Sequence, residues 1–323
     1  MKVIVSSRVA KEYGARIRRA VPRVRLAVPE VRDGAVAWTA DPAGADACCF
    51  SEDLWQEEEQ RRLVLPHLFR IEGLRWLHTF SAGVDAPVFQ VLLDRGVILT
   101  NSSGATAKPI AQYVIAMMLH RAKRIAELGE QQRRREWREL PADELTGRTA
   151  GIVGTGAIGG EVARLAKAFG MHVIGARRSE RRARWVDEQV TPKQLPRLLS
   201  RSDYVVLACP LTKETEGMIG ERELRAMKPT ATLINIARGR VVQEDALVRA
   251  LREGWIAGAC LDVFATEPLP EDSELWSMPN VVVTPHNSGF SPLNMDRAMA
   301  LFLDNLERFA ADRPLRNRVR STG

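Results

Sequence analysis

Short apolar runs alternate with helical patterns along almost the whole chain. Residues 157–169 place Val162, Leu165, Ala166 and Phe169 on one stripe at spacings of three and four, which predicts an amphipathic helix. Ten further runs predict buried strands. They lie at residues 2–6, 45–50, 75–80, 97–101, 150–154, 172–176, 204–208, 232–237, 258–264 and 281–285. This alternation predicts an α/β fold, in which helices cover both faces of parallel sheets.

The predicted strands fall into two groups. One occupies roughly the first hundred residues, and the other runs from Gly151 to about Pro285. A helical stretch at about 106–126 separates them, and a charged segment follows it as far as Leu145. Within this stretch, IAQYVIAMML is apolar nearly all round, so more than one neighbour must bury it. A last helical pattern follows Pro292 and could join either group.

Length and composition agree with two domains of ordinary size, because the chain has 323 residues of which 45% are hydrophobic. No run of eighteen apolar residues predicts a transmembrane helix, and the N-terminal apolar run is too short for a signal peptide. We therefore expect a cytoplasmic protein with no membrane partner.

The net charge of +7 would draw in anionic small molecules. Basic residues are nevertheless mixed with acidic ones, as in RAKRIAELGEQQRRREWREL, which favours a solvated face over a nucleic-acid site. The cysteines share apolar surroundings without metal-ligand spacing, and no histidine clusters with them. They are Cys48, Cys49, Cys209 and Cys260. We expect buried cysteines and no metal site.

A glycine-rich turn follows the strand predicted at 150–154. Gly154 permits a tight turn, Gly156 lets the backbone approach a pyrophosphate, and Gly159 lets the helix pack closely on its strand. The N-terminus of the helix that follows the turn would then favour the negative charge of the pyrophosphate. The strand, turn, helix and second strand form the context that a dinucleotide site requires. The predicted contacts are Gly154, Thr155, Gly156, Ala157, Ile158 and Gly159.

At the end of the second strand of this unit, where NAD-binding proteins carry an acid for the adenosine ribose, Arg177 stands instead. Arg178 and Ser179 follow it. A guanidinium would bind a 2′-phosphate, which a carboxylate would repel. These residues predict a preference for NADP(H), with NAD(H) as an alternative. The other interpretation is that the arginines are ordinary surface charges in an arginine-rich chain.

Three later stretches each follow the carboxyl end of a predicted strand: NIARGR, DVFATEP and TPHNSG. Ligands of open α/β sheets bind along that edge, so Arg238, Glu267 and His286 could converge. A histidine can donate a proton near neutral pH, a carboxylate can orient it and favour its protonated form, and a guanidinium can bind a carboxylate and a carbonyl oxygen. His78 is a weaker acid candidate, and Tyr113 and Trp137 are expected to be packing residues.

With FSAGVD at 80–85 and ACPLTKETEGMI at 208–219, these motifs resemble the D-isomer-specific 2-hydroxyacid dehydrogenases over nearly the whole chain. The resemblance implies two Rossmann- or flavodoxin-like doubly wound domains with an active-site cleft between them. A discontinuous substrate domain would comprise 1–101 and 290–323, and a dinucleotide-binding domain 102–289. The activity would be that of a 2-oxoacid reductase that uses NADP(H).

The resemblance also assigns roles to individual residues. His286 would be the acid/base, Glu267 would tune it, and Arg238 would bind substrate. The FSAGVD loop would bind the substrate carboxylate. Its predicted contacts are Ser81, Ala82, Gly83 and Val84. Further cofactor contacts would come from Cys209, Pro210, Thr212, Ala237 and Asp262, the last accepting from the carboxamide. A two-fold dimer would form largely through residues 106–146.

The chain departs from the family pattern at Gln112, where an acid is frequent, and at Arg177. Glu267 argues against formate oxidation, because the relatives with that activity carry glutamine there. Two other functions stay open. One is a nucleotide-sensing protein similar to the family's transcriptional corepressors, and the other is a dehydrogenase of another small anion such as phosphite. The substrate side chain and the physiological direction are not determined by the sequence.

Overall fold

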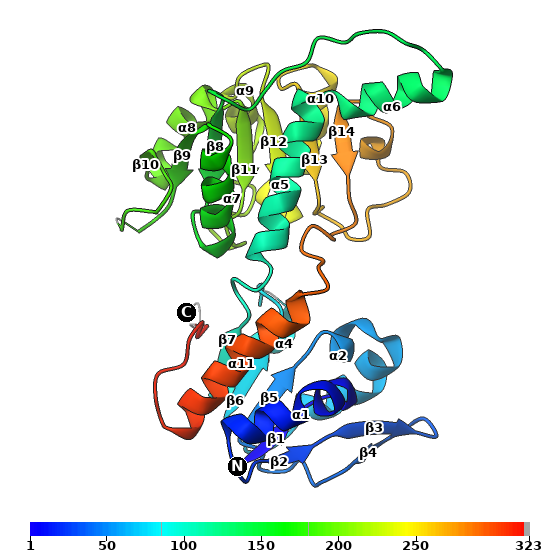
Figure 1. The fold of residues 1–323 in the computed structure, drawn as a ribbon, viewed down its shortest axis with the longest axis vertical. Coiled ribbons are helices and arrows are strands. Elements are labelled where there is room, and N and C mark those ends of the chain that lie inside the picture. The colour runs from blue at the N-terminus through cyan, green and yellow to red at the C-terminus, as the bar shows by residue number, and fades with distance from the viewer. Residues whose placement is uncertain (85, 180, 320–323) are drawn as a thin grey trace. The chain divides into compact units, whose positions relative to one another are not determined.

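The computed structural model describes residues 1–84, 86–179 and 181–319, without the side chains of residues 55 and 56. Asp85, the last residue of the FSAGVD motif, lies outside this description. The chain divides into two compact units (Figure 1). Unit 1 comprises Met1–Ala105 and Pro292–Gly323, and unit 2 comprises Thr106–Ser291. The boundaries expected from the sequence, after residues 101 and 289, fall four and two residues earlier.

Unit 1 contains a five-stranded parallel sheet in the order β2-β1-β5-β6-β7. This is the flavodoxin-like order, with β3 and β4 added as an antiparallel hairpin. The strands are β1 (Lys2–Ile4), β2 (Arg25–Ala27), β3 (Pro29–Arg32), β4 (Ala35–Trp38), β5 (Ala47–Phe50), β6 (Trp76–Thr79) and β7 (Ile98–Asn101). The helices are α1 (Ser7–Ala20), α2 (Asp53–Gln56), η1 (Gln60–Val64), α3 (Leu65–Leu68), α4 (Pro87–Asp94) and α11 (Asn294–Ala310).

Successive strand residues point to opposite sides of this sheet, so apolar side chains lie on both faces. Helices cover both faces. Cys49 and Trp76 belong to a core shared with α1 and α11, whereas Cys48 and Leu77 belong to a core shared with α2–α4. The indole of Trp76 stacks on Phe302 of α11, with ring centroids 5.5 Å apart. The last helix therefore belongs to the same core as the N-terminal strands.

His78 on β6 is wholly buried in this first core. Its Nδ1 lies 2.8 Å from the Thr100 hydroxyl, and its Nε2 lies 3.0 Å from the Ser102 hydroxyl. Burial lowers the pKa of His78 to about 3. The ring is therefore neutral at physiological pH and acts as a core residue rather than as the weaker acid candidate that the sequence offered.

Unit 2 contains a seven-stranded parallel sheet in the order β10-β9-β8-β11-β12-β13-β14. Numbered within the unit, this is the 3-2-1-4-5-6 order of a Rossmann fold with a seventh strand. The strands are β8 (Thr149–Val153), β9 (His172–Ala176), β10 (Glu188–Val190), β11 (Tyr204–Leu207), β12 (Thr232–Asn235), β13 (Gly258–Leu261) and β14 (Val281–Val283).

Two helical layers bury this sheet. Tyr204 and Val206 of β11 share one core with α5 and α7, and Val205 and Leu207 share the other with α8–α10. Figure 1 shows α5 and α7 side by side over one face. The helices and short helical turns of unit 2 are α5 (Ala107–Ala122), α6 (Ile125–Arg134), α7 (Ala157–Ala168), η2 (Pro192–Gln194), α8 (Leu195–Arg201), α9 (Glu221–Arg225), η3 (Gly239–Val241), α10 (Glu244–Arg252) and η4 (Glu274–Trp276).

The α/β fold with parallel sheets is confirmed, and a strand lies within each of the ten predicted runs or overlaps it. Four strands were not predicted: β2, β3, β4 and β10. Two packing expectations are wrong. Phe169 is 40% exposed because α7 ends just before it, and Trp137 is fully exposed on the segment after α6. Among the described residues, no helix combines the length and apolar character needed to cross a membrane.

Candidate active site

The functional residues predicted in unit 2 all lie at or just beyond the carboxyl ends of its strands. Because these strands are parallel and in register, their carboxyl ends meet at one edge of the sheet. The glycine turn follows β8, Arg177 follows β9, Cys209 follows β11, Asp262 follows β13, and His286 follows β14. The fold thus gathers on one edge residues that are up to 132 positions apart, from Gly154 to His286.

The glycine turn has the close contacts that its three glycines allow. Gly154 has a φ of 97°, and an added Cβ would lie 2.7 Å from the backbone of Ala208 and Cys209. A Cβ on Gly159 would lie 2.0 Å from the Gly154 carbonyl oxygen. Glycine is therefore required at 154 for the turn and at 159 for the approach of α7 to the sheet.

The middle glycine is different, because a Cβ on Gly156 would meet no atom of the chain within 4 Å. That open space lies at the N-terminus of α7, where the N–H groups of the first turn have no partner within the helix. Ala157 and Ile158 are the first two helical residues. Among the described residues, no group hydrogen-bonds the buried Thr155 hydroxyl. These groups fit a phosphate-bearing ligand.

The end of β9 presents cations where an acid is usual. The Arg177 N–H donates to the Val190 carbonyl, which fixes the backbone, while Arg178 and Ser179 are exposed. Neither guanidinium forms an ion pair with a carboxylate in the described part of the chain. The Ser179 hydroxyl accepts from the Arg181 N–H at 3.2 Å. Two cationic side chains and a hydroxyl group are therefore gathered at this strand end.

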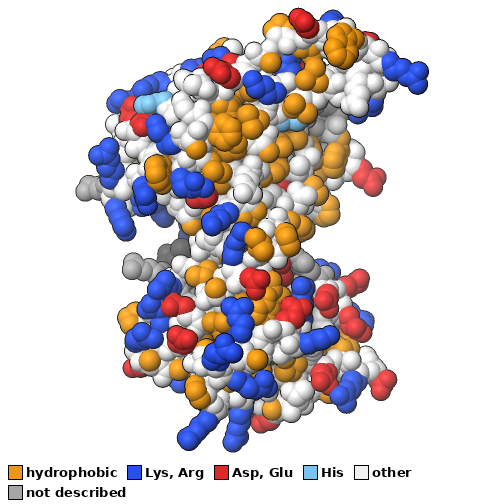
Figure 2. Space-filling model, viewed as in Figure 1, with side chains coloured by type: hydrophobic (Ala, Val, Ile, Leu, Met, Phe, Trp, Pro, Cys, Tyr) orange, Lys and Arg blue, Asp and Glu red, His pale blue; other side chains and the backbone are white. Residues whose placement is uncertain are grey.

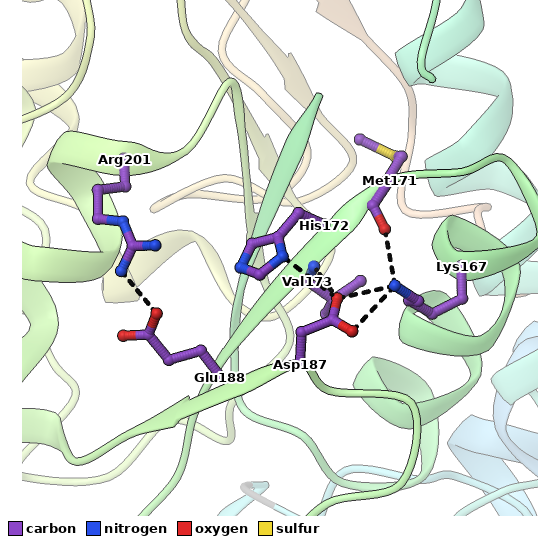
Figure 3. A network of polar contacts seen from close by, with 7 residues as sticks. All are labelled: Lys167, Met171, His172, Val173, Asp187, Glu188 and Arg201. Carbon is purple, nitrogen blue, oxygen red and sulfur yellow. Dashed lines mark hydrogen bonds and ion pairs between the residues drawn. The ribbon is translucent and has the colours of Figure 1, made fainter. Parts of the chain in front are cut away.

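Among the described residues, the first acids that follow in sequence, Asp187 and Glu188, do not replace the missing carboxylate, because they lie near the amino ends of β9 and β10 (Figure 3). Asp187 accepts from Lys167 Nζ at 2.9 Å and from the Val173 N–H at 2.8 Å. Burial would raise the pKa of Asp187, but these bonds outweigh it and lower the pKa. Glu188 pairs with Arg201 at 2.6 Å. Both acids hold the sheet edge together three to four residues along the strand from Arg177, which is about 10–13 Å.

The loop after β11 lies against the glycine turn, since Cys209 N would touch a Cβ on Gly154. Cys209 is partly buried, and burial raises the pKa of its thiol to about 11, so it is not a reactive thiolate at neutral pH. Pro210 and Thr212 continue this loop, which Thr215 closes by donating to the Pro210 carbonyl at 2.7 Å.

Arg238 follows β12 in a tightly packed turn. Asn235, which is buried, accepts from the Ala237 N–H at 3.1 Å and donates to the Arg238 carbonyl at 3.2 Å. The next residue, Gly239, packs so closely on Phe264 that an added Cβ would lie 1.8 Å from the Phe264 carbonyl carbon. This contact brings the backbone that carries Arg238 to the loop that carries Glu267.

His286 and Glu267 form the pair that the sequence suggested. Nδ1 of His286 lies 2.7 Å from Glu267 Oε2. The other carboxylate oxygen accepts from the Phe264 N–H at 3.0 Å, which orients the carboxylate. The imidazole is half exposed. A carboxylate on Nδ1 leaves Nε2 as the ring nitrogen that can exchange a proton with a ligand.

Asp262, by contrast, is engaged within the chain. It is 1% exposed, and its carboxylate accepts from the Thr284 hydroxyl at 2.6 Å and from the N–H groups of Asn287 and Ser288 at 3.0 Å. Its carbonyl accepts from the His286 N–H at 2.9 Å. This set of bonds surrounds His286, whose φ of 51° is unusual for a residue other than glycine.

Tyr113, which the sequence suggested only as a packing residue, supports this turn. The Tyr113 hydroxyl of α5 lies 2.8 Å from Thr284 Oγ1. Since the Thr284 hydroxyl hydrogen is directed to Asp262, Tyr113 is the donor. Burial raises the pKa of Tyr113, so its proton is retained. Only the TPHNSG motif hinted at these partners, because Tyr113 is 171 positions from Thr284.

The FSAGVD loop belongs to unit 1 and follows β6. Ser81 is exposed, and Ala82, Gly83 and Val84 are partly exposed. Among the described residues, none accepts a hydrogen bond from the N–H groups of Ala82, Gly83 and Val84. Consecutive N–H groups of this kind can form an anion-binding concavity.

Comparison with known proteins gives a consistent result. A family model described as D-isomer specific 2-hydroxyacid dehydrogenase, NAD binding domain, matches residues 115–288. The glyoxylate reductase of Thermococcus gammatolerans is 42% identical, over 73% of this chain and 80% of that protein. The glyoxylate reductase of Korarchaeum cryptofilum is 39% identical, over 73% of each.

Two solved structures are similar over almost their whole length. One is a D-isomer specific 2-hydroxyacid dehydrogenase from Xanthobacter autotrophicus in complex with NADPH and MES, with a TM-score of 0.81, 29% identity and coverage of 99% of this chain and 97% of that one. The other is an NADPH-dependent glyoxylate/hydroxypyruvate reductase from Sinorhizobium meliloti in complex with NADP and sulfate, with a TM-score of 0.77, 27% identity and coverage of 98% and 97%.

Proposed function

The chain belongs to the D-isomer specific 2-hydroxyacid dehydrogenase family and is an oxidoreductase of the CH–OH group, and we propose that it reduces a small 2-oxo acid with NADP(H). The observation that carries this proposal is the His286–Glu267 pair at 2.7 Å, on the same sheet edge as the glycine turn and Arg238. We propose that unit 2 is the dinucleotide-binding domain and unit 1 the substrate domain.

The proposed cofactor is NADP(H), with NAD(H) as a weaker alternative. The open space at Gly156 and the N-terminus of α7 would receive the pyrophosphate. Arg177, Arg178 and Ser179 would hold the 2′-phosphate, because a guanidinium binds phosphate through a fork of donors. The NADPH and NADP bound in the two similar structures support this choice.

When bound, the nicotinamide supplies the hydride that reduces the carbonyl carbon. His286 would donate a proton from Nε2 to the carbonyl oxygen, while Glu267 holds Nδ1 and so fixes the direction of Nε2. Arg238 would bind the substrate carboxylate and polarise the carbonyl through its planar fork of donors. The N–H groups of 82–84 would bind the same carboxylate from unit 1.

Among 2-oxo acids, we propose glyoxylate or hydroxypyruvate as the substrate class. The support comes from relatives named glyoxylate reductase at 42% and 39% identity and from the glyoxylate/hydroxypyruvate reductase structure.

We also assign Asp262 a positioning role for the His286 turn, since its carboxylate already accepts from three partners in the chain.

We propose that the enzyme is a homodimer formed through α5, α6 and the segment that follows. Figure 2 shows hydrophobic side chains gathered over α5. Trp137 is fully exposed, and Ile125 and Leu128 are 50% and 42% exposed. Exposed large hydrophobic residues in one stretch of chain are typical of a surface that a partner covers.

The cofactor assignment predicts that the wild-type enzyme has a higher kcat/KM for NADPH than for NADH. The double variant Arg177→Ala/Arg178→Ala should lose about tenfold or more with NADPH, because each charge-assisted hydrogen bond contributes about 1.5–3 kcal/mol. Its activity with NADH should change little. Arg182→Ala, an exposed arginine nearby, is the control for net charge. A clear wild-type preference for NADH would rule the assignment out.

The assigned roles predict different kinetic effects with glyoxylate. His286→Ala should lower kcat by about 10²–10⁴ with little change in KM, because it removes the proton donor. Arg238→Ala should raise KM and lower kcat, because it removes both binding and polarisation. Arg240→Ala, an exposed neighbour paired with Glu216, serves as control. Near-normal kcat/KM in either site variant would remove that assignment.

The dimer proposal predicts a mass in solution of twice the 36.0 kDa chain, measured by light scattering. Trp137→Glu should shift the protein towards the monomer, since it places a charge in the proposed interface. Trp276→Glu alters a tryptophan that is 54% exposed outside this segment and should leave the mass unchanged. A wild-type monomer at micromolar concentration would contradict the proposal.

A further inference from the structure

The FSAGVD loop of unit 1, the proposed carboxylate loop, is oriented by hydrogen bonds to the carbonyl groups of Ser81 and Ala82. The Ser102 N–H donates to the Ser81 carbonyl at 3.1 Å, and Nδ2 of Asn101 donates to the Ala82 carbonyl at 2.7 Å. A trans peptide is planar, so its C=O and N–H point in opposite directions. Holding the carbonyls of 81 and 82 therefore sets the directions of the N–H groups of Ala82 and Gly83.

Asn101 can hold the loop because its own side chain is fixed. Its Oδ1 accepts from the Ser103 N–H at 3.1 Å, which turns Nδ2 towards Ala82. Asn101 lies at the end of β7, next to β6, the strand from which the loop leaves. One amide side chain thus connects the end of β7 to the middle of the proposed carboxylate loop.

The C-terminal segment holds Asn101 in turn. The Asn101 N–H donates to the Asn317 carbonyl at 3.2 Å. Nδ2 of Asn317 donates to the carbonyls of Asn101 and Ser103, at 3.1 and 2.9 Å. Asn317 has a φ of 53°, a conformation that asparagine tolerates better than most residues. Its side chain therefore spans the short turn from 101 to 103.

The segment around Asn317 is anchored on both sides. Before it, the backbone of Arg316 exchanges two hydrogen bonds, at 2.8 and 3.0 Å, with the side chain of Asn305, which is 1% exposed on α11. After it, the Val319 N–H donates to the Leu99 carbonyl at 2.9 Å. The segment 316–319 thus joins the last helix to the edge of β7.

We propose that Asn101 and Asn317 are positioning residues for the substrate carboxylate, and that the C-terminal segment 316–319 thereby sets the affinity for the 2-oxo acid. The inference rests on the proposed function, in which the N–H groups of 82–84 bind that carboxylate. Neither side chain needs to touch substrate. Asn317 orients the backbone around Asn101, and Asn101 orients the peptide that presents the Gly83 N–H.

The test is steady-state kinetics with glyoxylate and NADPH on three variants of the full-length enzyme. Asn101→Ala removes the bond to Ala82. Asn317→Gly removes both Nδ2 bonds and still permits a positive φ. Asp312→Gly is the matched control, because Asp312 also has a positive φ, of 49°, in the same C-terminal region and no side-chain contact with the loop.

KM for glyoxylate should rise about tenfold in Asn101→Ala and about threefold in Asn317→Gly, while KM for NADPH stays within twofold of wild type. Asp312→Gly should match wild type for both substrates. The split between the two KM values separates positioning from a general loss of structure, which would affect both. Should Asn101→Ala fail to fold, Asn317→Gly decides alone.

Unchanged KM for glyoxylate in folded variants of an active enzyme would overturn this inference and leave the proposed function standing. An equal rise in both KM values would also overturn it, since the role would then be structural only. A wild-type enzyme that does not oxidise NADPH with glyoxylate or hydroxypyruvate would instead overturn the proposed function, and this inference with it.

Discussion

The candidate site depends on the hydrogen bonds that the buried carboxylate of Asp262 accepts. The carboxylate accepts from Thr284, Asn287 and Ser288, and so closes the chain around His286. A histidine with a φ of 51° persists only where its surroundings impose that conformation. In this conformation, His286 lies 2.7 Å from Glu267, which belongs to a different loop. The Asp262 bonds hold the loop of His286, and the Phe264 N–H orients the Glu267 carboxylate at 3.0 Å.

The sheet extends this arrangement to the other functional groups. Parallel strands end at one edge, and the packing of Gly154 on Cys209 and of Gly239 on Phe264 draws neighbouring strand ends together. In the same way, the Asn101–Ala82 bond in unit 1 joins the ends of β6 and β7. Close packing and hydrogen bonds between adjacent strand ends thus hold several of the proposed ligand-binding groups, and helices cover both faces of each sheet.

The strand runs and the glycine turn could be predicted from the sequence because apolar runs and glycine spacing are local signals. Strands such as β2 and β10 could not, because their three residues, RLA and EQV, include charged or polar side chains and form no apolar run. The motifs TPHNSG and DVFATEP pointed to His286 and Glu267. They did not reveal that the Asp262 carboxylate is bonded within this turn, since Thr284 becomes its partner, and Tyr113 the partner of Thr284, only through tertiary packing. The exposure of Trp137 was missed because a single apolar residue carries no periodicity that distinguishes a buried side chain from an exposed one.

We propose that the Asp262 bonds make the His286–Glu267 pair productive. The most direct measurement is the single-turnover rate of glyoxylate reduction by Asp262→Asn with NADPH already bound, followed by the loss of nicotinamide absorbance. An asparagine keeps the size of the side chain but places an NH₂ group against one of the backbone donors. We expect the single-turnover rate of Asp262→Asn to be at least tenfold below that of wild type, while the affinity for NADPH is retained. A single-turnover rate within twofold of wild type would contradict it.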